Sequence, residues 1–92
     1  MEVKEAIQHA KAFATDILGG EGITNLGLEE VERDETAEVW RVTLGFSRPW
    51  NSVRNTLTAL TGEAAPRRAY RVFLVTDDGQ VVSMKRRTGT ED

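Results

Sequence analysis

The sequence predicts an α+β fold in which one N-terminal helix packs on a four-stranded antiparallel meander, in the order α-β-β-β-β. Three observations predict it: an apolar stripe at helical spacing, a later change to a period of two, and an Asp-Asp-Gly turn between two apolar runs. The 92 residues, 39% hydrophobic and 29% charged, suit one small globular domain. We expect a single domain over residues 1–87, with a long loop at 49–66 and a disordered tail at 88–92.

The first expected element is an amphipathic helix over residues 2–18. Its apolar stripe recurs at steps of four and three: Val3, Ile7, Ala10, Ala14 and Ile17. Gly19 and Gly20 are expected to end the helix, because glycine adopts the left-handed conformation of a helix stop at little cost. The stripe needs a sheet to cover it.

Two strands should follow, from Ile23 to Arg33 and from Val39 to Arg48. A bulge is expected in the first, near Glu29 and Glu30, because the apolar positions change parity there. In the second, apolar residues alternate with polar or small ones: Trp40, Val42, Leu44 and Phe46. Such alternation predicts one face packed against the helix and one face in water.

Pro49 is expected to close the second strand, since proline cannot donate to a β-ladder. The segment up to Pro66 reads as a loop with one or two helical turns at most, because Asn and Thr are frequent in it. Two further strands are expected at 67–76 and 80–87, joined by Asp77-Asp78-Gly79. A three-residue turn of this kind makes Thr76 face Gln80.

In that register one side of the hairpin pairs Leu74 with Val82 and Val72 with Met84, and we expect this side to face the helix. The core prediction then comprises Ile7, Ala10, Phe13, Ala14, Ile17, Leu26, Leu28, Trp40, Val42, Leu44, Phe46, Val72, Leu74, Val82 and Met84.

The other side of the hairpin becomes the outer face of the sheet. It carries an apolar patch with a cationic border, made of Phe73, Val75 and Val81 with Arg71 and Lys85. Because the outer face of an antiparallel sheet is usually polar, such a patch indicates a contact surface. The loop at 49–66 could instead cover it. We therefore predict a small non-enzymatic protein-interaction module whose partner is another protein or a second copy, as in a homodimer.

Charge suggests an alternative function. The chain has a net charge of −3, yet Met1 to Phe46 carries four Lys/Arg against ten Asp/Glu, and Ser47 to Asp92 carries eight against five. A nucleic-acid-binding domain could use the basic end of the last hairpin: Arg67, Arg68, Arg71, Lys85, Arg86 and Arg87. The overall acidity, with a pI near 5.2, argues against this alternative.

Residues for catalysis are sparse. The chain has no cysteine and one histidine, His9, which lies off the helix stripe. Serines 47, 52 and 83 have no basic partner at a recognisable spacing. We expect no enzyme activity, cofactor or metal site. With no apolar stretch near the ~20 residues of a membrane span and no signal-like start, we expect a cytoplasmic protein.

Three segments carry a resemblance to a known family. They are "VKEAIQHAKAF", "ITNLGLEEVERDETAEVWRVTLGF" and "YRVFLVTDDGQVVSMK", the last with Asp77, Gly79 and Val81 in a D-x-G-x-V turn. In this order they resemble the PepSY family, which implies a cystatin-like arrangement with the helix laid across the sheet. The resemblance also implies an interaction or inhibitory module, and it supplies no catalytic residues.

Overall fold

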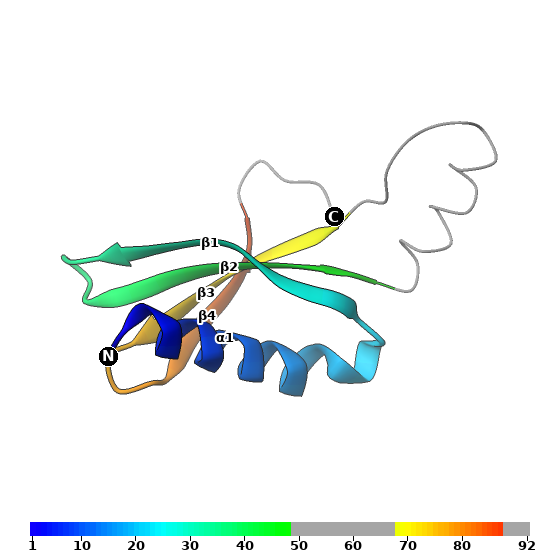
Figure 1. Ribbon diagram of the computed structural model, residues 1–92, viewed down its shortest axis with the longest axis horizontal. Helices are drawn as coiled ribbons and strands as arrows, with labels where there is room; N and C mark the ends of the chain where they lie inside the picture. The colour runs from blue at the N-terminus through cyan, green and yellow to red at the C-terminus, as the bar shows by residue number, and fades with distance from the viewer. Residues whose placement is uncertain (49–67, 88–92) are drawn as a thin grey trace.

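The computed structural model describes residues 1–48 and 68–87, which form one α-helix lying along one face of a four-stranded antiparallel sheet (Figure 1). The strands are hydrogen-bonded in the order β1-β2-β3-β4, so neighbours in the sequence are neighbours in space. The predicted α+β class and helix-then-meander order are confirmed. The predictions of a loop at 49–66 and of a disordered tail at 88–92 lie outside the described residues.

Helix α1 spans Val3–Leu18. At its start the backbone N–H of Glu2 donates to Glu5 Oε1 at 3.2 Å, which satisfies a donor that has no partner within the helix. At its end a short 3₁₀ turn, Gly19–Glu21, precedes Gly22, which takes the left-handed conformation with φ 74°. The helix therefore stops near the predicted place, but Gly22 supplies the left-handed residue that was expected at Gly19 or Gly20.

The buried line of α1 consists of Ala6, Ala10, Ala14 and Leu18, at steps of four. Three alanines in succession let the helix backbone approach the sheet closely, and Ile7 and Phe13 pack at the flanks. The predicted stripe was thus partly wrong. Ile17 is 50% exposed, because the alanine line turns it away from the sheet.

The four strands are β1 (Thr24–Asp34), β2 (Val39–Ser47), β3 (Ala69–Thr76) and β4 (Val81–Arg86). The bulge predicted near Glu29 is confirmed, since the β1–β2 register shifts between Leu28 and Glu30. A second shift lies between Thr24 and Gly27. These irregularities interrupt the pairing of β1, which is an edge strand.

The helix-facing side of β2 carries Val42, Leu44 and Phe46, all buried as predicted, and half-buried Trp40. The neighbouring strand β3 places Phe73 opposite Val42 and Val75 opposite Trp40. Phe73 and Val75 are consequently in the core, at 0% exposure. This overturns the prediction for β3: its two faces are reversed, because antiparallel pairing puts directly opposed residues on the same side of the sheet.

Val72 and Leu74, predicted in the core, therefore lie on the opposite side of β3. They are only half-buried.

Strand β4 contains a bulge that the sequence did not reveal. The turn before it is as predicted: Gly79 has φ 87°, and the Thr76 backbone N–H donates to the Gln80 carbonyl at 2.9 Å. Val75 then pairs with Val81, but Leu74 pairs with Ser83, so Val82 is an extra residue.

The bulge turns both Val81 and Met84 toward the helix, where they pack against the core. The predicted pairs Leu74–Val82 and Val72–Met84 are wrong, as is the outer position of Val81. Three residues expected in the core are exposed instead: Ile17, Leu28 and Val82.

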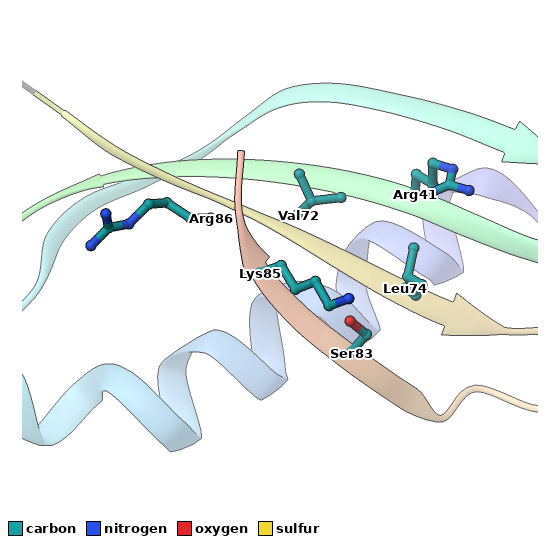
Figure 2. Close-up of a pocket in the computed structure, with 6 residues that line it drawn as sticks. All are labelled: Arg41, Val72, Leu74, Ser83, Lys85 and Arg86. Carbon is teal, nitrogen blue, oxygen red and sulfur yellow. The ribbon is translucent and has the colours of Figure 1, made fainter. Parts of the chain in front are cut away.

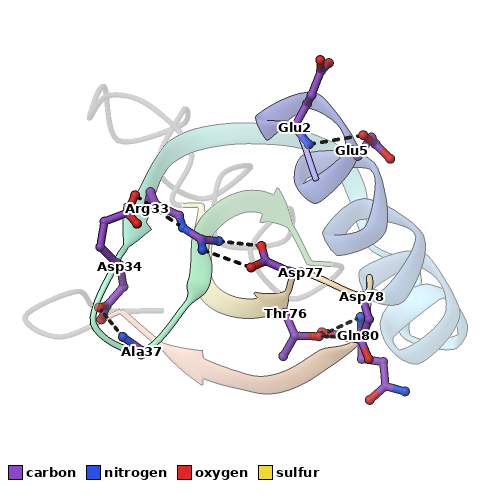
Figure 3. Close-up of polar contacts among 10 residues, drawn as sticks. Glu2, Glu5, Arg33, Asp34, Ala37, Thr76, Asp77, Asp78 and Gln80 are labelled. Carbon is purple, nitrogen blue, oxygen red and sulfur yellow. Dashed lines mark hydrogen bonds and ion pairs between the residues drawn. The ribbon is translucent and has the colours of Figure 1, made fainter.

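A side-chain bridge ties the far end of β1 to the turn between β3 and β4 (Figure 3). Arg33 donates two hydrogen bonds to the Asp77 carboxylate, at 2.7 and 3.1 Å. Its guanidinium also lies 5.4 Å from the centre of the Trp40 ring. The Arg33 charge holds the pKa of Asp77 below its ordinary value, chiefly through the side-chain hydrogen bond. This bridge links two segments 44 residues apart.

Candidate interaction surface

The outer face is the side of the sheet that does not contact α1, and two rows of residues cross it from β1 to β4. The first row consists of Glu30, Thr43, Val72 and Lys85, each directly opposite the next. The second row consists of Glu32, Arg41, Leu74 and Ser83. Both rows have an acid on β1 and an aliphatic side chain on β3.

A pocket of about 200 Å³ opens on this face. Its lining comprises Arg41, Val72, Leu74, Ser83, Lys85 and Arg86. Figure 2 shows Val72 and Leu74 on β3, between Arg41 of β2 on one side and Lys85 of β4 on the other, while the Arg86 side chain extends away from the group. The pocket thus combines an aliphatic centre with cationic borders.

Arg41 is already paired with acids of β1. Its Nη2 donates to Asp34 Oδ2 at 2.7 Å, and its Nε lies 3.7 Å from Glu32 Oε1. Asp34 also accepts a hydrogen bond from the Ala37 backbone N–H at 3.0 Å (Figure 3). That backbone bond, followed by the Arg41 contact, lowers the pKa of Asp34. The charge of Arg41 is therefore largely balanced within the chain.

Lys85 and Glu30 differ from Arg41 in having no such ion pair among the described residues. Both are exposed, and within residues 1–48 and 68–87 neither takes part in a salt bridge. They lie at opposite ends of the first row. Among the described residues, the first row consequently ends in an acid without a salt bridge on β1 and in a lysine without one on β4.

Further along the outer face, the chain fills the surface with its own side chains. Gly45 leaves room there, because a Cβ on it would lie 3.0 Å from both Arg68 Nη2 and Tyr70 Cε1. Arg68 Nη2 donates to the Asn25 carbonyl at 2.8 Å, and the Arg87 guanidinium lies 4.2 Å from the Tyr70 ring centre. The outer face is therefore filled by side chains around Gly45 and hollowed at the pocket.

Of the five residues predicted for the contact surface, only Lys85 lies on the outer face. Phe73 and Val75 are core residues and Val81 packs against the core. Arg71 stands opposite Leu44 on the helix-facing side, with its guanidinium 5.9 Å from the Phe46 ring centre. The proposed placement of the patch was wrong, for the reason given by the β2–β3 register.

The sequence pattern placed Arg41 on the wet face of its strand, but Arg41, Val72 and Leu74 were not predicted as part of the contact surface. A signal for them was present: Arg41 alternates with core residues of β2, so it had to point outward. Pairing Arg41 with β3 would have brought Leu74 to the same face.

The six cations of the nucleic-acid alternative do not form one cluster in the part of the chain that is described. Arg71 and Arg86 oppose each other in one helix-facing register position, whereas Lys85 belongs to the outer face. Arg68 is held by β1, and Arg67 lies outside the described residues. Acids share the outer face with Lys85, namely Glu30, Glu32 and Asp34.

His9 lies beside the turn between β3 and β4, since a Cβ on Gly79 would be 2.9 Å from its Nε2. Among the residues whose positions are described, no three His, Asp or Glu side chains gather in a way that could hold a metal ion. In the same part of the chain, no helix is both long enough and apolar enough to cross a membrane.

Comparison with known proteins gave no relatives: no protein-family model, curated protein or solved structure matches this chain.

Proposed function

We propose that the chain is a small non-enzymatic protein-interaction module whose contact surface is the outer face of the sheet, centred on Val72 and Leu74. The observation that carries the proposal is the pocket, where these two side chains lie beside a lysine that has no salt bridge in the described ranges. Aliphatic side chains beside an uncompensated charge provide both apolar contact area and orientation.

The side chains that line the pocket indicate which groups a partner would present to it. A protein segment would place an apolar side chain on Val72 and Leu74 and bring a carboxylate to Lys85. Arg41 adds little selectivity for acids, because Asp34 and Glu32 already balance its charge. Apolar burial would supply most of the affinity, and the Lys85 contact would fix the register of the partner.

Nucleic acid fits this face less well. A nucleic-acid strand that crosses this face from Lys85 would meet the carboxylates of Glu30, Glu32 and Asp34 on the β1 side. Salt separates the two partners, because phosphate binding weakens steeply with ionic strength whereas an apolar contact does not. The sequence resemblance to the PepSY family, which remains a prediction, also favours an interaction role. The cytoplasmic location likewise remains a prediction.

Peptide selection tests the proposal. A displayed library of random peptides is selected on the wild-type protein, and binding is then measured to Leu74→Asp and to Ile17→Asp. Ile17 is a matched control, since it is an exposed aliphatic residue on the helix side of the molecule. Circular dichroism first establishes that both variants are folded.

We expect selected peptides to combine Asp or Glu with aliphatic residues, to bind Ile17→Asp normally and to lose at least tenfold in affinity for Leu74→Asp, about 1.4 kcal/mol. Selection of basic peptides, or equal binding to Leu74→Asp and the wild type, would contradict the assignment of the surface.

A further inference from the structure

The charges of the first row of the outer face would complement those of an identical row running in the opposite direction. The first row begins with the exposed acid Glu30 on β1 and ends with the exposed base Lys85 on β4, with buried Thr43 and half-buried Val72 between them. Neither end is neutralised by a salt bridge among the residues that are described. A second copy with its row reversed would supply the missing partner at both ends.

Two copies can stack their outer faces about a two-fold axis that lies in the interface plane. The strands of the two copies are aligned for two directions of this axis. If the axis is parallel to the strands, β1 of one copy lies over β4 of the other, so Glu30 meets the second copy's Lys85 twice. If the axis is perpendicular to the strands, Glu30 lies over Glu30 and Lys85 over Lys85. Charge therefore selects the parallel axis, since like charges in contact oppose association.

The second row fits the same operation. With the axis parallel to the strands, Ser83 of one copy lies over Glu32 of the other, where the hydroxyl can donate to the carboxylate. The aliphatic side chains of Val72 and Leu74 from both copies come together beside the axis. Sheets packed in this way lie about 10 Å apart, a distance that such side chains fill.

Pairing of the sheet edges is a poorer route to self-association. The register of β1 shifts twice, and β4 is only six residues long and contains the bulge at Val82. Bulges and short length are the features that keep edge strands from adding another strand. The face, rather than the edge, is the available surface.

We propose that the partner of the outer face is a second copy of this chain, stacked face to face about a two-fold axis parallel to the strands, with two Glu30–Lys85 contacts between copies. The inference rests on the proposed function of this face. It adds the identity of the partner and the symmetry of the complex.

Charge reversal with mixing tests the proposal. Sedimentation equilibrium over a concentration series gives the dimer dissociation constant of the wild type, of Glu30→Lys, of Lys85→Glu, of their equimolar mixture and of the double variant. Both residues are exposed, so the substitutions leave the core unchanged. Each single variant places two like-charge contacts in its homodimer, and we expect its dissociation constant to rise at least tenfold.

The mixture should recover the wild-type constant to within about threefold, because the mixed dimer regains two opposite-charge contacts, and the double variant should do the same. Single variants that dimerise as well as the wild type would overturn the proposal, as would a mixture that stays as weak as either variant alone.

Failure of this inference can be told apart from failure of the proposed function. A wild-type protein that is monomeric up to about 1 mM overturns self-association, since any dimer would then be weaker than about 4 kcal/mol. If selected peptides still require Leu74, the outer face remains a contact surface for another protein. A wild-type dimer that persists unchanged in Leu74→Asp overturns this inference, because it would use a different surface, and selected peptides that bind Leu74→Asp as well as the wild type overturn the proposed function.

Discussion

Phe13 of α1 packs edge-on against Phe73 of β3, with ring centroids 6.1 Å apart and ring planes at 74°. Edge-to-face contact is a favoured geometry for aromatic pairs. The pairing of β3 with β2 turns Phe73 toward the helix, where this contact is made, and turns Val72 and Leu74 toward the opposite side. The position of the proposed interaction surface follows from this facing of β3.

Truncating Phe73 should destabilise the fold far more than truncating its neighbour. Phe73→Ala removes a fully buried ring, and we expect it to lower the free energy of unfolding by about 3–5 kcal/mol. Leu74→Ala, on the half-buried outer side, should cost about 1 kcal/mol. Urea denaturation measures both. Equal losses would show that the two faces of β3 are not distinguished as described.

The alanine line of the helix should resist enlargement. Ala10→Leu inserts three carbons where the residue is fully buried against the sheet, so we expect a loss of about 1–3 kcal/mol in the free energy of unfolding. Ala12→Leu is the matched control, because Ala12 is exposed on the same helix. Its effect on thermal unfolding should be close to zero. An Ala10→Leu protein as stable as the control would refute close helix–sheet approach at this point.

Part of this architecture was predictable because the pattern was unambiguous. In β2, apolar Trp40, Val42, Leu44 and Phe46 alternate with polar or small residues, so only one face could be buried. The order of elements followed from the change of period after Gly22, and the bulge near Glu29 from the change of parity within β1.

The faces of β3 were not predictable from its own residues. Odd- and even-numbered positions of β3 are both apolar, with Phe73 and Val75 on one side of the strand and Val72 and Leu74 on the other. The choice is made by pairing with β2, which joins residues roughly thirty positions apart in the chain. The prediction of the turn at Gly79 was correct. The bulge at Val82 shifts every later residue pair between β3 and β4, and nothing in the sequence of β4 predicts this bulge.

The turn between β3 and β4 should require glycine at position 79. Gly79 has φ 87°, a region that costs an L-residue about 1–2 kcal/mol, so Gly79→Ala should lower the free energy of unfolding by that amount. The added Cβ also meets His9 at 2.9 Å. Repeating the substitution in His9→Ala separates the effects, because the backbone cost must persist when the ring is absent.

Gly19→Ala serves as the control for that substitution. Gly19 has φ −57°, and an added Cβ there meets nothing within 4 Å. Its replacement should leave stability unchanged or raise it by up to about 1 kcal/mol. A destabilisation at Gly19 equal to that at Gly79 would argue against the backbone explanation.

Acid should remove the contribution of the Arg33–Asp77 bridge. The bridge lowers the pKa of Asp77 in the folded state below the ordinary value of about 3.9. Its contribution is therefore complete above that value and is lost as the pH falls through the folded pKa. The difference in unfolding free energy between the wild type and Arg33→Met should be larger at pH 6 than at pH 2.

The same substitution should move the NMR titration midpoint of the Asp77 carboxyl upward. Arg41→Met provides the comparison, since Arg41 pairs with Asp34 and not with Asp77. An Asp77 midpoint that shifts equally in both variants would show that the effect is not local to the bridge.

Methyl NMR spectra recorded over a dilution series test the central claim, that the outer face is where the protein makes contact with a second copy. We expect the methyl shifts of Val72 and Leu74 to change with concentration, while those of the core residues Val42 and Val75 stay constant. Concentration-dependent shifts confined to exposed aliphatic residues elsewhere, such as Ile17 and Leu28, would contradict it, as would the absence of any change up to millimolar protein.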